Sequence, residues 1–266
     1  MRMNESLTER NNIKIWGQGT KPVFFIHGYG CDQQMWRFIT PAFEQTHKIV
    51  LMDLVGSGQS DTNAYDYEKY ASLEGYARDI VEICETFSFE NTILVGHSVS
   101  AMIAGLAAAM QPALFAKLVM VCPSPRYVND GEYNGGFSRT DIDEMIQTLN
   151  SNYLGWTSAI TPVIMGNPDK PGFAEELAGS FCRNNPAIAK HFAQVTFNGD
   201  HRHDLKHITQ PTLIIQCTDD VLAPSEVGDF VHGQIENSTL ETLKATGHCP
   251  HLTAPIETID ALIRFV

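Results

Sequence analysis

The sequence predicts an α/β fold, with a mostly parallel central sheet and helices on both of its faces. Short runs of apolar and β-branched residues alternate with stretches of helical periodicity along most of the chain. Most of these runs contain few polar residues, as is typical of strands in a parallel sheet that helices cover on both faces. The predicted strands are residues 22–26, 48–52, 92–95, 117–121, 211–215 and 239–243.

Three helices are predicted between and after these strands. Residues 73–87 place apolar side chains on a helical period, with charged residues between them. Residues 101–110 are rich in Ala, Leu and Met, and Pro112 ends that helix. Residues 255–266 form a last amphipathic helix. This alternation of strands and helices is what favours a parallel sheet.

Residues 125–206 interrupt the alternation, because they contain no convincing strand. They hold four helical stretches separated by Pro and Gly, at residues 141–149, 153–160, 173–181 and 186–197. A helical insertion between two strands is best placed over the carboxyl ends of the sheet, where open α/β sheets bind ligands. We therefore expect a core formed by residues 1–124 and 207–266, with residues 125–206 inserted as a helical lid.

Composition excludes several classes of partner. The chain has 266 residues, 43% of them hydrophobic, and a formal net charge of −13. A nucleic-acid partner or an anionic membrane surface would require a basic patch, and none is visible. The first twenty residues resemble no signal peptide, and no run is apolar enough to span a membrane. The six cysteines are scattered without a CxxC pair, so free thiols and a cytoplasmic location are expected.

The strongest catalytic signal is the pentapeptide Gly96-His97-Ser98-Val99-Ser100. A predicted strand precedes it and a predicted helix follows it, which is the context of the nucleophile elbow of the α/β-hydrolase fold. Such a sharp turn lifts the serine hydroxyl above the sheet and requires small neighbours. The usual motif ends in Gly, and Ser100 is a small replacement. Ser98 is the predicted nucleophile.

A serine hydroxyl requires a base, and in this fold the acid and the base follow the serine in the order Ser, Asp, His. His248 comes just after the last predicted strand, in the position of the base. Asp219 and Asp220 both follow the strand 211–215. The pattern D-x-x-x-P fits Asp220, which we predict as the acid, with Asp219 as the alternative.

The oxyanion hole should consist of backbone N–H groups. One donor is Val99, the residue after the nucleophile. The second donor is expected in the Gly-rich loop after the strand 22–26, where Tyr29 is the candidate and its ring should face the pocket.

No metal or cofactor is predicted. Residues 56–60 lack the Lys and the Gly spacing of a phosphate loop. The histidines of segment 201–207 lie in a polar linker without credible ligand geometry, and a zinc site at His251 would take His248 from its role as base. Cys31 and Cys249 flank site residues and are expected to be packing residues.

Beyond the elbow, several segments make the chain resemble one branch of the α/β hydrolases. These are residues 96–102, 129–130, 133–137, 152–156 and 246–251. The chain is similar to the bacterial RsbQ energy-stress (sigma-B) regulators and to the plant strigolactone and karrikin receptor hydrolases. This resemblance implies a V-shaped lid of four helices over an apolar pocket. It also implies pocket-lining roles, with lid-core packing as the alternative, for Phe137, Trp156, Phe192, Phe197 and Val221. Tyr29 departs from the family, which often has Phe there.

The sequence therefore supports two functional hypotheses. The first is a serine hydrolase that cleaves a small apolar ester or lactone through an acyl-enzyme. The second is a ligand-sensing role in stress signalling, in which the lid surface binds a regulatory partner and hydrolysis is secondary. The resemblance implies a PAS-domain phosphatase as that partner.

Overall fold

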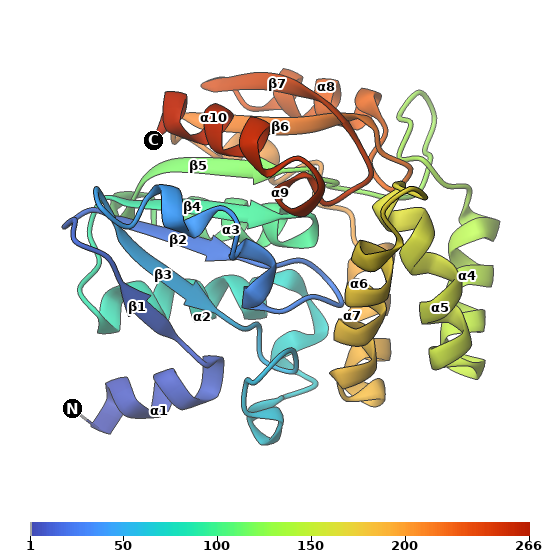
Figure 1. Ribbon diagram of the computed structural model, residues 1–266, viewed down its shortest axis with the longest axis horizontal. Helices are drawn as coiled ribbons and strands as arrows, with labels where there is room; N and C mark the ends of the chain where they lie inside the picture. Colours follow the sequence, from blue (N-terminus) through green and yellow to red (C-terminus); the bar gives the residue numbers. More distant parts are fainter. Residues whose placement is uncertain (1) are drawn as a thin grey trace.

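The structure is a computed structural model that describes residues 2–266 and contains a seven-stranded sheet of order β1-β3-β2-β4-β5-β6-β7 (Figure 1). Strand β1 is antiparallel to β3, and all other neighbours are parallel. The strands are β1 (Lys14–Trp16), β2 (Pro22–Ile26), β3 (Lys48–Met52), β4 (Thr92–His97), β5 (Phe115–Val121), β6 (Thr212–Asp219) and β7 (Ser238–Thr246). The mostly parallel α/β sheet is thus confirmed, with all six predicted strands.

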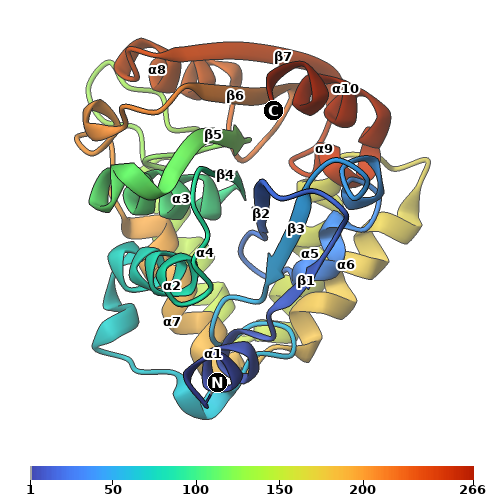
Figure 2. The ribbon, with the colours of Figure 1, turned by 90° about the vertical axis from the view of Figure 1, so that its left-hand side faces the viewer.

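Helices cover both faces of the sheet, as Figure 2 shows for α2, α3 and α8 on one side and for α9 and α10 on the other. The core helices are α1 (Arg2–Asn11), α2 (Leu73–Thr86), α3 (Val99–Met110), α8 (Ser225–Gln234), α9 (Pro250–Thr253) and α10 (Pro255–Phe265). Successive strand residues point to opposite faces. Phe24 and Ile26 therefore join the core under α2, α3 and α8, whereas Val23 and Phe25 join the core under α10.

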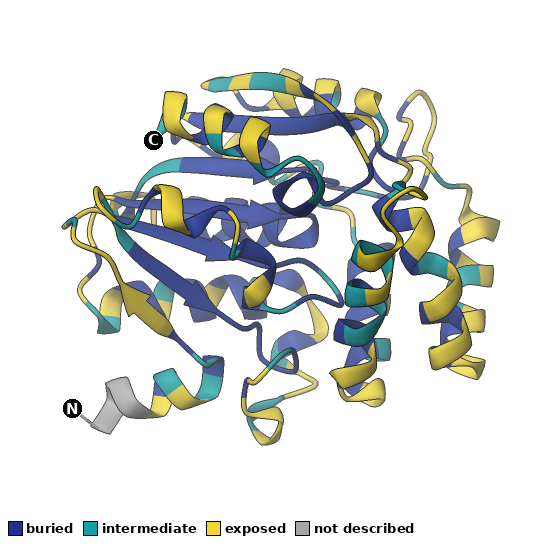
Figure 3. Cartoon of the chain, in the orientation of Figure 1, coloured by how far each residue is buried: buried dark blue, intermediate teal, exposed yellow. Residues whose placement is uncertain are grey.

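Residues 125–206 contain four helices at the carboxyl ends of the strands, and we refer to them as the lid segment (Figure 1). They are α4 (Arg139–Ser151), α5 (Tyr153–Met165), α6 (Pro171–Arg183) and α7 (Pro186–Asn198). Helix α5 packs on α4 and α6, and α4 packs on α7. The inner sides of these helices are buried and their outer sides are exposed (Figure 3). Among the described residues, no helix is both long and apolar enough to cross a membrane.

Candidate active site

Ser98 lies between the end of β4 and the start of α3, in a strained backbone conformation with φ 59° and ψ −127°. Residues other than glycine rarely adopt a positive φ, and such strain is common at functional sites. The turn requires small neighbours, because a Cβ at Gly96 would lie 2.1 Å from the carbonyl oxygen of Ser100. Ser100 donates a 2.5 Å hydrogen bond from Oγ to the carbonyl oxygen of His27. The serine in place of the usual glycine therefore ties α3 to the end of β2.

The structure brings Ser98, His248 and Asp220 into one chain of hydrogen bonds. His248 Nε2 lies 2.7 Å from Ser98 Oγ, and His248 Nδ1 lies 2.7 Å from Asp220 Oδ2. All three side chains are buried. With Asp220 as the acceptor at Nδ1, His248 carries its proton there and leaves Nε2 free to accept the proton of the serine. This is the arrangement of a serine nucleophile, its base and the residue that orients the base.

The local structure distinguishes Asp220 from Asp219. Asp220 Oδ1 accepts hydrogen bonds from the amides of Leu222 at 2.9 Å and Ala223 at 3.1 Å. These two donors hold the carboxylate so that its other oxygen faces His248. Asp219 is exposed, and within the described part of the chain its carboxylate accepts one long bond, of 3.3 Å, from Thr246. The structure therefore places Asp220, and not Asp219, next to the base.

The predicted oxyanion donors lie beside the nucleophile. Val99 is the first residue of α3, so its amide has no acceptor within the helix. The Gly-rich loop after β2 lies directly against the nucleophile. A Cβ added at Gly28 would lie only 3.1 Å from Ser98 Cβ. Tyr29 follows in this loop. Within the described residues, neither amide donates a hydrogen bond to another group of the protein. Both amides are thus available to a substrate oxygen.

The hydroxyl of Tyr29 bonds to the lid segment. It donates a 2.9 Å hydrogen bond to the carbonyl oxygen of Ala189 on α7. The ring lies edge-on to Phe181 at 5.3 Å and to Phe197 at 5.9 Å between ring centroids. Burial raises the pKa of this hydroxyl well above its usual value, so it stays protonated. The side chain therefore connects the loop after β2 to the lid segment.

A narrow cavity with a volume of about 30 Å³ lies above Ser98. Its wall is mostly apolar, with contributions from the lid helices and from the core. The lid segment contributes Tyr127, Met145, Trp156, Ile160, Ile164, Leu177, Phe181, Thr196 and Phe197, and the core contributes Tyr29, Cys31, His97, Leu222 and Cys249, besides Ser98 and His248. Of the predicted pocket residues, the structure places Trp156 and Phe197 in this wall.

The other three predicted pocket residues lie elsewhere, and these assignments are corrected. Val221 is 59% exposed, because the turn that brings the amides of Leu222 and Ala223 to Asp220 directs its side chain outward. Leu222 lines the cavity instead. Phe192 packs into the core next to Tyr76, with ring centroids 4.7 Å apart.

Phe137 is the third correction, since this half-buried residue packs at the edge of the apolar core of the lid segment. Sequence reasoning also missed Leu177 and Phe181, which lie one helical turn apart on α6 and line the cavity. Their i, i+4 spacing was a usable signal for one apolar helix face, although it did not show that this face points to a cavity.

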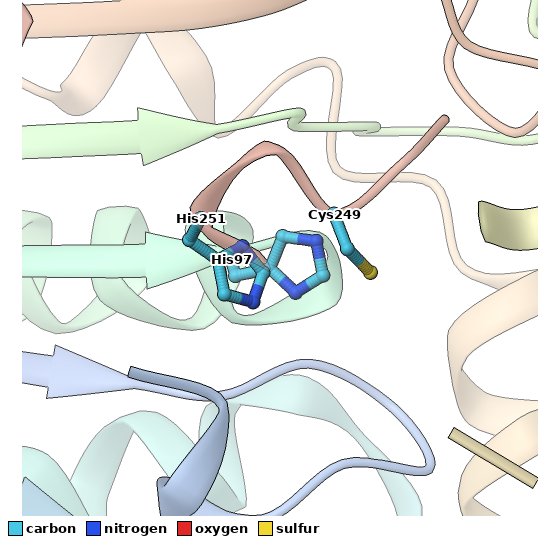
Figure 4. Close-up of side chains that lie close together, drawn as sticks. All are labelled: His97, Cys249 and His251. Carbon is cyan, nitrogen blue, oxygen red and sulfur yellow. The ribbon is translucent and has the colours of Figure 1, made fainter. Parts of the chain in front are cut away.

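His97, Cys249 and His251 form a buried cluster behind the nucleophile (Figure 4), with ligand-type atoms within 4.8 Å of one another. Burial lowers the pKa of His97 well below its usual value and that of His251 to about 3. Burial also raises the pKa of the Cys249 thiol well above its usual value. A metal would require the thiolate. The structure therefore favours three neutral packed side chains, and a site without metal stays our prediction.

The neutral histidines predict a stability that falls in acid. In the unfolded chain His97 and His251 titrate near 6.5, whereas in the folded protein their pKa values are far lower. The unfolded state therefore binds more protons below pH 6.5, and the free energy of unfolding decreases as the pH falls, by about 1.4 kcal/mol per pH unit for each histidine. Urea unfolding over a pH series measures this slope. The variant His251→Phe should have a shallower slope, and an unchanged slope would contradict the assignment.

A parallel sheet that carries a hydrogen-bonded Ser–His–Asp group at its carboxyl ends defines a hydrolase-type architecture. The comparisons with known proteins agree. A family model described as "Alpha/beta hydrolase family" matches residues 23–261. The chain belongs to the α/β hydrolase family.

Similar proteins include plant receptors and esterases. The karrikin insensitive 2 receptor CA of Petunia hybrida is 38% identical, over 97% of this chain and 96% of the relative. The strigolactone esterase D14 of Arabidopsis thaliana is 34% identical, over 97% of each chain. A solved structure of a hydrolase from Oleispira antarctica has a TM-score of 0.96 and 42% identity, and covers 98% of this chain and 96% of its own. The predicted resemblance to the plant hydrolases is thus confirmed, and relatives named as esterases support ester hydrolysis.

Proposed function

We propose that this protein is a serine hydrolase that cleaves a small, largely apolar ester or lactone through an acyl-enzyme on Ser98. The observation that carries the proposal is the Ser98–His248–Asp220 chain, with two hydrogen bonds of 2.7 Å, at the base of an apolar cavity. These residues contain a nucleophile, a base and a fixed carboxylate, which are the groups that acyl transfer requires.

The geometry gives each group a step. Ser98 Oγ attacks the carbonyl carbon of the substrate while His248 Nε2 takes the hydroxyl proton, and the amides of Val99 and Tyr29 stabilise the oxyanion. When the intermediate collapses, His248 returns the proton to the leaving alcohol oxygen. A water molecule then attacks the acyl-enzyme, with His248 again as the base, and releases the acid and free Ser98. Asp220 stays ionised and stabilises the imidazolium in both halves.

The cavity limits the substrate class. The cavity is narrow, with a volume of about 30 Å³, and its apolar wall favours a small uncharged group over a charged polymer. Thr196, a polar residue of the wall, has a buried Oγ1 that lacks a hydrogen-bond partner among the described residues. Since a buried hydroxyl is costly when it is unpaired, a substrate oxygen is a suitable partner for it. We infer an ester or lactone that has one further acceptor oxygen.

Trapping the acyl-enzyme tests this proposal. We expect p-nitrophenyl acetate to release a burst of about one p-nitrophenolate per protein molecule before the steady state. Mass spectrometry of the protein quenched in acid should find the acetyl group on Ser98. Hydrolysis with the acetyl group on another residue, or without any acylated protein, would contradict the proposed chemistry.

A second candidate function is ligand sensing, which is supported by the 38% identity to a protein named as a karrikin insensitive 2 receptor. The lid segment also exposes two large apolar side chains on α5, with Leu154 60% and Val163 44% exposed. In this alternative the lid segment binds a regulatory partner, with a PAS-domain phosphatase as the proposed partner and the cytoplasm as the proposed location. Binding of such a phosphatase to the wild type, and its loss in the variant L154S/V163S, would favour this alternative.

A further inference from the structure

The main chain of His248 is held on both sides. Its N–H donates a 2.8 Å hydrogen bond to the carbonyl oxygen of Ile164 at the end of α5. Its carbonyl oxygen lies 2.8 Å from Nε2 of His97. The side chain of His248 makes two further bonds, to Ser98 and Asp220. Of the two partners outside the Ser98–His248–Asp220 group, Ile164 bonds through its backbone and His97 bonds through its side chain.

The bond to His248 determines where His97 carries its proton. A carbonyl oxygen only accepts, so His97 Nε2 must carry the hydrogen and donate it. Nδ1 is then unprotonated, and it is buried without a partner. This nitrogen lies against the loop after β2, because a Cβ at Gly28 would be 2.8 Å from it. The ring of His97 therefore lies between the loop that holds the base and the loop that is expected to hold the oxyanion.

The surroundings keep this ring in place. The ring centroid of His97 lies 4.4 Å from that of His251, at an angle of 61° between the rings (Figure 4). His251 lies in turn against Trp36, with centroids 4.6 Å apart. His97 is only 2% exposed, so water does not compete for its Nε2–H. Because the cluster is closely packed, a shift of His97 moves both neighbouring loops.

We propose that His97 is a positioning residue for the base. Its Nε2–H holds the carbonyl oxygen of His248, and its ring sets the distance between His248 and the loop after β2. The inference rests on the proposed function, because it assigns His97 to the alignment of that same reaction. Among the described residues, His97 makes no hydrogen bond to Ser98 or Asp220, so we assign its effect to the bond with His248. Misplacement of a catalytic group by 1 Å costs about 10²-fold in rate, so a single bond to the base is sufficient to matter.

Two substitutions separate the hydrogen bond from the packing. The variant His97→Gln places an amide Nε2 donor at about the reach of the histidine Nε2. The variant His97→Asn is similar in polarity, but its amide donor ends nearer the backbone and falls short of His248. We expect kcat for a p-nitrophenyl ester to fall by about 10²-fold in His97→Asn with KM nearly unchanged, and to recover by about tenfold in His97→Gln. Thermal unfolding of both variants serves as the control for folding.

The outcomes decide between a positioning role and a packing role. Equal activity of both variants and the wild type would overturn the proposal. Equal losses of kcat, in parallel with equal losses of stability, would assign His97 to packing and also overturn it. A readout that is independent of catalysis is the ¹⁵N spectrum of the imidazoles, in which His97 should be the neutral Nε2–H tautomer. If the wild type forms no acyl-Ser98 but His97 is the Nε2–H tautomer, the proposed function is wrong and the hydrogen bond from His97 to His248 is still supported. If His97 is instead the Nδ1–H tautomer, the positioning role is wrong.

Discussion

Replacement of Ser98 by alanine is expected to lower kcat for a small ester by on the order of 10⁶, with little change in KM. Among the described residues, the hydroxyl is the hydrogen-bond partner of His248 Nε2, at 2.7 Å, so its removal leaves the base without a nucleophile. The residual rate should come from the oxyanion donors and from substrate binding, which stay in place. Steady-state kinetics with p-nitrophenyl acetate measure the loss, and the burst phase should vanish with it.

Ser100 provides the matched control two residues away. The variant Ser100→Ala removes a buried hydroxyl that bonds to the carbonyl oxygen of His27. It should cost about 1 kcal/mol of stability and leave kcat within about tenfold of the wild type. If Ser100→Ala lost as much activity as Ser98→Ala, the loss in both variants would be due to disruption of the turn and not to removal of the Ser98 hydroxyl. Wild-type hydrolysis by Ser98→Ala would refute the nucleophile.

The sequence was sufficient to predict the strands that are buried on both faces. Their apolar runs are short and bounded, and β2 is buried along its whole length. Strand β1 was missed because all three of its residues are exposed and it contains no alternation of polar and apolar residues. Helix α8 was also missed, since only Val227, Gly228 and Val231 are buried in it and the apolar stripe is narrow.

The meeting of Ser98, Asp220 and His248 was predictable, whereas most of the cavity wall was not. Ser98, Asp220 and His248 each follow a strand of a parallel sheet, so the topology alone brings them to the same edge. The cavity wall depends instead on which side of each lid helix faces inward, and on turns such as the one that directs Val221 outward. The side of each lid helix that faces inward is determined by packing between helices that are far apart in the sequence. A single sequence does not show this packing.

The variant Asp220→Asn is expected to lower kcat by about 10⁴, the loss seen when the corresponding aspartate of a serine protease becomes an amide. The Asn amide can donate to His248 Nδ1, which would shift the ring proton to Nε2 and prevent it from accepting the proton of Ser98. The substitution keeps the size of the side chain. It also keeps an oxygen for the amides of Leu222 and Ala223, so folding should be retained.

The adjacent Asp219→Asn variant makes the same chemical change one residue away and is the sharpest control. Asp219 is exposed, and the one hydrogen-bond partner of its carboxylate among the described residues is Thr246 at 3.3 Å, so kcat should stay within about twofold of the wild type. Measuring kcat for both variants, with circular dichroism as the folding check, compares the two candidate acids directly. A large loss in Asp219→Asn with a small loss in Asp220→Asn would transfer the role to Asp219. Because a neutral Asn cannot stabilise the imidazolium at any pH, raising the pH should restore little of the activity lost in Asp220→Asn.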